Sequence, residues 1–203
     1  MIIWTKGPEE WWNWDRVKDS VRSLRGRLGF EDVDELRFLG FRLSLSNGEV
    51  FDEILNRKLE FKERLPLYFI LHNYSLTSND IGLSGKLITF MDLSKIIGPC
   101  PTLGREVLKN FESTFGYNLS LLFSAARFFK HEVLDLGDAS IKIYSLPRVP
   151  IVLIVWGGDE EVSPSSNVMF DETIINYLPT VEIITRLTSI TIRRLIDASR
   201  ISR

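Results

Sequence analysis

The residues that most constrain the fold are 146–178, LPRVPIVLIVWGGDEEVSPSSNVMFDETIINYL. Within them, residues 149–156 form a short continuous apolar run rich in β-branched side chains, with prolines before it and Gly157 and Gly158 after it. A run of this length with these boundaries predicts a strand that is buried on both faces. The paired glycines allow a sharp turn, so we expect the chain to leave the sheet there.

An acidic loop is expected to follow this strand. Asp159, Glu160 and Glu161 come directly after the glycines, and because adjacent carboxylates repel one another, they should lie in water or face a cation. Pro164 and the serines around it are typical of a loop. Asp171 precedes two polar residues and an apolar set, which predicts the N-cap of a helix.

Motifs in two parts of the chain resemble those of a known family. The stronger set is GDA (137–139), LPRVP (146–150), WGGDEE (156–161), FD (170–171) and YL (177–178), followed by Glu182. The weaker set is LPL (65–67), His72, Tyr74, GKL (85–87) and TF (89–90). Together they cover roughly residues 65–195 and resemble an uncharacterised domain-of-unknown-function family of archaea and anaerobic bacteria. Val162 stands where the family pattern would have an aromatic residue.

The resemblance implies no particular activity. Some relatives carry an added cysteine-rich segment suggestive of an iron–sulfur cluster, and this chain has a single cysteine, Cys100. A role beside corrinoid or iron–sulfur enzymes is one idea that the family suggests, with the protein binding the enzyme rather than its metal.

Length and composition predict one globular domain over residues 1–203, because 44% of residues are hydrophobic and 26% are charged. A net charge of −2 gives no reason to expect nucleic-acid binding. One cysteine cannot form an internal disulfide, so we expect a cytoplasmic location. We expect no signal peptide and no membrane span. The absence of glutamine and the many isoleucine and charged residues favour a thermophile.

The pattern along the chain predicts an α+β fold, a mainly antiparallel sheet of about five strands packed by several helices. Strands are predicted at 36–45 and 50–61, a hairpin around Ser46-Asn47-Gly48, and at 85–91, 136–146 and 149–156. The last two should pair antiparallel. Helices are predicted at 13–25, 65–74, 107–115, after Asn118 and at 180–199. A buried strand is the alternative for 65–74, and the helices after Thr102 should cover one face of the sheet.

Several aromatic and histidine side chains have both a structural and a functional interpretation. Trp4, Trp11, Trp12 and Trp14 either pack on the body of the domain or form a binding platform. His72 is either a core residue with one hydrogen-bond partner or a ligand or catalyst. His131 should lie exposed at the end of a helix. Cys100, between two prolines, has no nearby group that would lower its pKa.

The chemistry that remains rests on carboxylates, because phosphate-binding loops, GxSxG, HExxH, EF-hand and paired CxxC motifs are absent from the sequence. Asp138 should lie near Asp159 if their strands pair, and Asp171 could approach from the loop. Such a cluster suits Mg²⁺ or Ca²⁺, or general acid–base catalysis. The structural alternative is that Asp171 caps a helix, Glu160 and Glu161 are solvated, and Asp159 binds backbone amides.

Two functions follow from these alternatives. The first is a non-catalytic binding or accessory module that contacts a protein or small molecule through residues 156–171. The alternative is a metal-assisted or carboxylate-based enzyme, with Lys86 or Arg148 near an anionic substrate. No metal ligands are assigned, and the cofactor, the partner and the oligomeric state are not predicted. The residues proposed for binding are Asp138, Trp156, Asp159, Glu160, Glu161 and Asp171.

Overall fold

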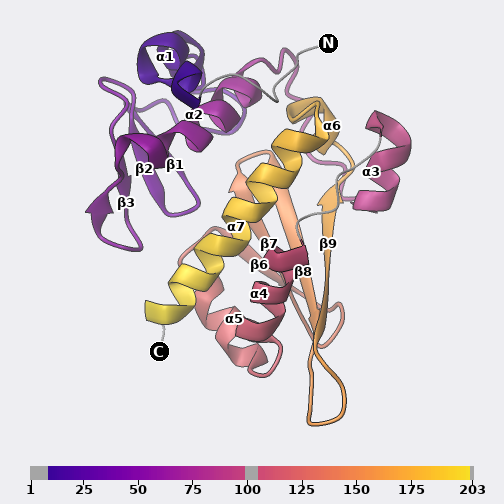
Figure 1. Cartoon of the computed structure of the whole chain (residues 1–203). Helices are drawn as coiled ribbons and strands as arrows, with labels where there is room; N and C mark the ends of the chain where they lie inside the picture. Colours follow the sequence, from indigo (N-terminus) through magenta and orange to yellow (C-terminus); the bar gives the residue numbers. More distant parts are fainter. Residues whose placement is uncertain (1–8, 99–104, 202–203) are drawn as a thin grey trace. The chain divides into compact units, whose positions relative to one another are not determined.

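Seven α-helices and two antiparallel sheets form the described part of the chain, residues 9–98 and 105–201, in the computed structural model (Figure 1). This arrangement confirms the predicted α+β class. The described residues divide into two compact units, one of residues 9–37 and 41–80 and the other of residues 38–40, 81–98 and 105–201. One domain over 1–203 stays a prediction. The predictions for Trp4 and Cys100 lie outside the described residues.

The first unit combines helices with a small four-stranded sheet of order β1-β2-β3-β4. Its elements are η1 (Glu9–Trp12), α1 (Trp14–Arg22), β1 (Glu35–Phe38), β2 (Phe41–Ser44), β3 (Val50–Asp52), β4 (Arg57–Lys58) and α2 (Phe61–Ser75). The predicted hairpin is confirmed between β2 and β3, where Leu43 pairs with Val50. Its two strands are shorter than predicted. Leu39 and Gly40 both have positive φ and turn the chain after β1, and the Asp52 carboxylate accepts hydrogen bonds from the amides of Ile54 and Leu55.

Helix α2 confirms the predicted helix and excludes the strand alternative, but it begins earlier than Pro66. Glu60 and Glu63 form a capping box, which satisfies amides at the helix start. Two of the N-terminal tryptophans pack on this unit: Trp12 lies edge-on to Phe69, and Trp14 contacts Tyr68. Trp11 is exposed, so the structural interpretation holds for two of the three described tryptophans.

The second unit contains a five-stranded sheet of order β5-β9-β8-β7-β6. Its elements are β5 (Leu87–Thr89), α3 (Phe90–Ile97), α4 (Arg105–Phe115), α5 (Leu119–Ala126), β6 (His131–Leu134), β7 (Ala139–Leu146), β8 (Val149–Trp156), β9 (Ser165–Asp171), α6 (Ile174–Tyr177) and α7 (Val181–Ile201). As predicted, β8 is a buried strand that pairs antiparallel with β7. It is the central strand of the sheet. Helices α4, α5 and α7 lie together over one face of this sheet (Figure 1).

Several predictions for this unit differ from the structure. Ser165 and Ser166, predicted to lie in a loop, begin strand β9, which pairs along most of β8. His131 does not lie at a helix end: it begins the edge strand β6 and pairs with Ile143. The strand predicted at 85–91 ends at Thr89, because the Thr89 and Asp92 side chains form a capping box that starts α3.

Candidate functional site

The loop between β8 and β9, residues 157–164, is fixed at its base by close packing of glycines. The amide of Gly158 donates to the carbonyl oxygen of Gly116, in the turn after α4, over 3.1 Å. A Cβ atom on Gly158 would lie 2.5 Å from Pro164 Cδ, and one on Gly116 would lie 2.3 Å from Pro164 Cβ. Glycine is therefore needed at both positions, because any side chain would force these segments apart.

Asp138 holds the start of β7 against the same loop. Its carboxylate accepts a hydrogen bond from the amide of Gly157 at 2.8 Å, and its own amide donates to the Val155 carbonyl at 3.1 Å. The structure thus places Asp138 beside the glycine turn, where the antiparallel pairing of β7 and β8 was expected to bring it. The carboxylate joins two neighbouring strand ends.

Asp159 braces the tip of the loop from within. Its Oδ1 atom accepts hydrogen bonds from the amides of Val162 and Glu161, both at 2.8 Å, and its own amide donates to the Val162 carbonyl at 2.9 Å. These two amides lower the pKa of the Asp159 carboxyl from its usual value, because they stabilise the charged form. This is the structural alternative that the sequence left open for Asp159.

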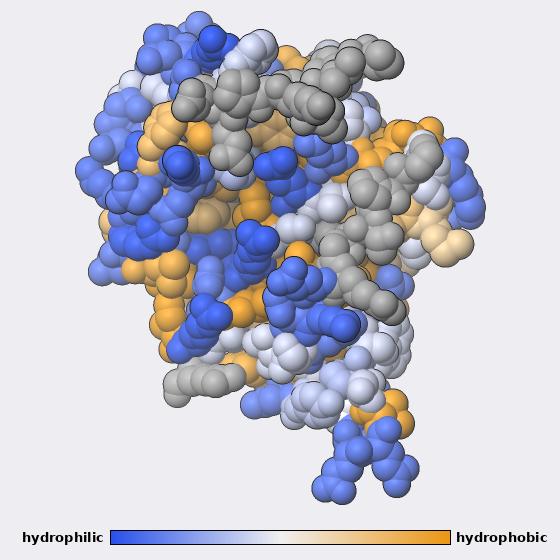
Figure 2. Space-filling view, viewed as in Figure 1, coloured by the Kyte–Doolittle hydropathy of each residue, from blue (hydrophilic) through white to orange (hydrophobic). Residues whose placement is uncertain are grey.

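The tip of the loop is residues 160–162, and the side chains of these residues take no part in the hydrogen bonds of Asp159. Glu160, Glu161 and Val162 are all exposed, and Val162 retains 62% of its accessible surface. Within the described part of the chain, neither glutamate carboxylate has a hydrogen-bond or ion-pair partner. Figure 1 shows the loop extending beyond the end of the sheet, and Figure 2 shows a hydrophilic projection there with a small hydrophobic area.

Trp156 stands at the base of the loop, on the last residue of β8. It is 39% exposed, so it is not the buried strand residue that is ordinary for tryptophan. Its ring lies against Gly137, where an added Cβ atom would come within 3.3 Å of Trp156 Cε2. An aromatic surface is therefore exposed beside the acidic loop.

Asp171 lies at the opposite end of the sheet. In the β8–β9 pairing Trp156 is opposite Ser165 and Ile151 is opposite Phe170, which separates the two ends by about 17 Å at the usual strand rise. The four carboxylates of the enzyme hypothesis, Asp138, Asp159, Glu161 and Asp171, are therefore not brought together. Among the described residues, no group of three or more His, Cys, Asp or Glu side chains could hold a metal ion.

The Asp171 carboxylate ends β9 and does not cap a helix as predicted; the N-cap of α6 is Thr173. Only 3% of Asp171 is exposed, and its oxygens accept hydrogen bonds from the Gly85 amide at 2.7 Å, the Ser84 amide and hydroxyl at 3.2 Å, and the Thr173 amide and hydroxyl at 3.0 and 2.7 Å. Burial acts to raise the pKa of Asp171, but the hydrogen bonds outweigh it and the pKa is lowered. The charged group is a structural anchor.

Motifs from two distant parts of the sequence meet around this anchor. Lys86 Nζ lies 2.7 Å from Glu172 Oε2, the rings of Phe90 and Phe170 meet edge to face at 4.7 Å, and the Tyr177 hydroxyl donates to the Gly82 carbonyl at 3.0 Å. The GKL, TF, FD and YL motifs thus form one packed corner at β5 and β9. Lys86 lies at this corner and not beside the acidic loop.

The His72 ring is half-buried and, among the described residues, has one hydrogen-bond partner, as the structural interpretation expects. Its Nδ1 atom lies 2.7 Å from Ser20 Oγ, and its ring lies against Trp12. Because the Ser20 hydroxyl also donates to the Val17 carbonyl, Nδ1 is the donor to Ser20. Burial lowers the pKa of His72.

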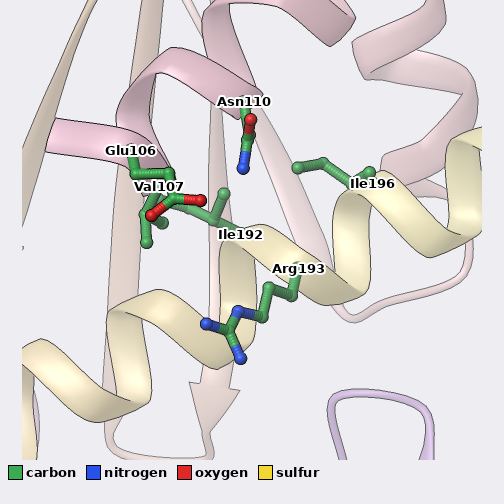
Figure 3. A pocket seen from close by; sticks show the side chains of 6 residues that line it. All are labelled: Glu106, Val107, Asn110, Ile192, Arg193 and Ile196. Atoms are coloured by element: carbon green, nitrogen blue, oxygen red, sulfur yellow. The ribbon is translucent and has the colours of Figure 1, made fainter. Parts of the chain in front are cut away.

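A groove between α4 and α7 was not predicted. Two adjoining hollows of about 90 and 370 Å³ share Asn110, Arg193 and Ile196. In Figure 3, Glu106, Val107 and Asn110 come from α4 and lie opposite Ile192 and Ile196 on α7, and the Arg193 side chain of α7 extends away from α4. The isoleucines have ordinary core spacing in the sequence, so nothing there distinguishes a groove from a buried helix contact.

Comparisons with known proteins add one result. No curated protein and no solved structure matches the chain. In the described residues, no helix is both long enough and apolar enough to cross a membrane. The sequence model of the family described as Domain of unknown function (DUF3786) matches residues 22–194, which include the acidic loop and the Asp171 corner. The chain therefore belongs to this family of domains of unknown function.

Proposed function

We propose that the protein is a non-catalytic binding module that contacts a partner protein through the β8–β9 loop and the adjacent Trp156. The observation that carries the proposal is the exposed, internally braced tip of the loop. The Asp159 carboxylate accepts hydrogen bonds from the amides of Glu161 and Val162. The side chains of Glu160 and Glu161 remain exposed.

Preorganisation of the loop supports this function. The Gly158–Gly116 hydrogen bond fixes the base, and the Ser166 hydroxyl donates to the Glu112 carboxylate on α4 at 2.8 Å. A loop that is already ordered before binding loses less conformational entropy when it binds. The tip side chains contribute little to the packing of the fold, so they are available for a partner.

The tip also defines the chemistry of that partner. Two carboxylates beside an exposed valine fit a small apolar surface flanked by basic groups, since complementary charge selects partners and speeds association. The partly exposed ring of Trp156 adds aromatic surface of the kind that is enriched at protein interfaces.

The positions of the carboxylates give less support to the alternative, a carboxylate-based enzyme. Asp171 lies six residues along β9 from the loop end, about 20 Å at the usual strand rise, and its carboxylate oxygens already accept hydrogen bonds. Asp138 and Asp159 each bind backbone amides.

Composition supports two further parts of the proposal. A single cysteine among 203 residues suits a cytoplasmic protein. The absence of glutamine and the charged content of 26% suit a thermophilic source, in line with the resemblance to archaeal and anaerobic-bacterial sequences.

The proposal is tested by reversing the charge of the tip. The double variant E160K/E161K is compared with wild type and with E31K/D135K, which makes the same change in net charge at two other exposed acids. Each immobilised protein is incubated with extract of the source organism, and retained proteins are identified by mass spectrometry. We expect a partner that wild type and the control retain and the tip variant loses. Equal retention by all three would contradict the proposal.

A further inference from the structure

We propose that the groove between α4 and α7 receives the β8–β9 loop of a second copy of this chain, so that the protein self-associates. This inference rests on the proposed function, because it takes the loop as the contact element and names its partner. The groove and the loop belong to the same unit, so the structure of that unit carries the whole argument.

The groove has an apolar floor with a basic wall. Val107 of α4 and Ile196 of α7, both partly exposed, line its floor, and the adjoining Ile192 is fully buried. Arg193 and Arg200, seven residues apart and so on the same face of α7, line the wider part of about 370 Å³. Two carboxylates also line the groove: Asp197 in the wider part, which pairs with Arg194 and Arg200, and Glu106 in the narrower part. In the wider part the guanidinium groups therefore exceed the carboxylate beside the apolar strip.

The arginines are available to an incoming anion. In the described residues Arg193 has no ion pair, and Figure 3 shows its side chain extending away from α4. Arg200 is 73% exposed at its side chain, with its Nη1 3.4 Å from Asp197 Oδ1. An exposed ion pair of this kind is weak, so Arg200 can turn to a new carboxylate at small cost.

The tip of the loop is complementary to this groove in both charge and polarity. Glu160 and Glu161 match Arg193 and Arg200, and guanidinium–carboxylate contacts can be bidentate. The exposed Val162 matches the strip formed by the partly exposed Val107 and Ile196. Within the described chain, these two glutamates and Arg193 have no partner of opposite charge, and a second copy would supply one to each.

The placement of both features on α4 favours a closed dimer. The base of the loop binds the turn after α4 through Gly116, and the groove runs along α4 from Glu106 to Thr114. Two copies related by a twofold axis can therefore exchange loops reciprocally, as a self-complementary interface requires. Each dimer would contain the contact twice.

A charge-swap experiment tests this pairing. One variant has a reversed tip, E160K/E161K, and the other a reversed groove, R193E/R200E. Masses of wild type, each variant and their equimolar mixture are measured by sedimentation velocity, with E31K/D135K as control. We expect dimers for wild type and control, monomers for each variant alone, and dimers again in the mixture, because both contacts in a mixed dimer then join opposite charges.

Several outcomes would overturn the inference. The inference is wrong if the wild-type protein stays monomeric up to about 1 mM. It is also wrong if either variant alone still forms a dimer, or if the mixture of the two variants stays monomeric. Thermal unfolding followed by circular dichroism checks that both variants fold, as expected for exposed substitutions. If wild type is monomeric but the tip variant loses a captured protein, the loop binds a different protein and only the self-association falls.

Discussion

The amide of Gly158 donates a hydrogen bond to the carbonyl oxygen of Gly116 across 3.1 Å. This contact joins a loop between two strands to a turn between two helices, about 40 residues apart in the sequence. It depends on the absence of side chains, because Pro164 fills the space that a Cβ atom on either glycine would need.

Replacing Gly158 with alanine should therefore destabilise the protein. The new Cβ atom would lie 2.5 Å from Pro164 Cδ and 2.8 Å from the Val162 carbonyl oxygen, and relieving such overlap costs about 1–3 kcal/mol. Gly157→Ala is the matched control, because its nearest contact would be an ordinary 3.5 Å. Urea unfolding of both variants decides the matter, and equal stability of the two would contradict the packing described.

Asp171→Asn should destabilise the second unit by about 1–3 kcal/mol. An NH2 group in place of Oδ2 would direct its hydrogen atoms at the Gly85 amide, which is itself a donor, and the remaining oxygen would be an uncharged acceptor for the Ser84 and Thr173 amides. Glu172→Gln, next in the chain, removes only an exposed ion pair with Lys86 and should change the unfolding free energy much less. A Glu172 variant as unstable as the Asp171 variant would count against the anchor.

The Asp171 carboxylate should also contribute to acid sensitivity. Its pKa is lowered in the folded protein, below an unfolded value of about 3.9. Its stabilising contribution is thus fully present above that unfolded value and is lost as the pH falls through the folded pKa. Unfolding free energies measured between pH 6 and pH 3, as an approximate window, should fall less steeply in Asp171→Asn than in wild type.

Tyr144 should ionise at unusually high pH. Its hydroxyl donates to the Glu132 carboxylate, which raises the pKa of Tyr144 to about 12. Because this exceeds the unfolded value of about 10, the contribution to stability is full below that value and is lost as the pH rises through the folded pKa. The titration is followed by the absorbance of tyrosinate, and the transition that is missing in Tyr144→Phe belongs to Tyr144. In Glu132→Gln the pKa of Tyr144 should be lower than in wild type. An unchanged pKa would contradict the contact.

His72 should weaken the first unit in mild acid. Burial lowers the pKa of His72, so the folded state favours the neutral ring. The free energy of unfolding is therefore highest above the unfolded-state pKa of about 6.5, and it declines as the pH falls below that value. Nuclear magnetic resonance titration of the ring should give a pKa below that value. Ser20→Ala, which removes the partner of Nδ1, should cost about 1 kcal/mol. A ring that titrates above the unfolded value would contradict a neutral His72 in the folded protein.

The parts of the fold that the sequence predicted are those defined by local pattern. The apolar run before Gly157 predicted β8, and the short link between Leu146 and Val149 predicted its antiparallel pairing with β7, because a tight connection leaves no other arrangement. Strand β9 was missed because it opens with Ser165, Ser166 and Asn167, which are weak strand formers, and its pairing with β8 is a tertiary effect.

The candidate site was predictable only in part, for the same reason. Asp138 beside the glycine turn follows from the pairing of neighbouring strands. The role of Asp171 depends on Ser84 and Gly85, which lie 87 and 86 residues away, so local pattern indicated a helix cap instead. The groove requires α4 and α7 to pack together, and no local pattern in either helix reveals it.

The central claim is that the β8–β9 loop is the contact element, and cross-linking from its tip tests that claim most directly. A photoreactive residue is placed at Val162, which is 62% exposed, and separately at Val133 on the edge strand β6, which is 59% exposed. Both proteins are irradiated at matched concentration, alone and in extract of the source organism. We predict a cross-linked product, with a second copy or another protein, from position 162 and none from position 133. Equal products from both positions, or none from position 162, would contradict the account.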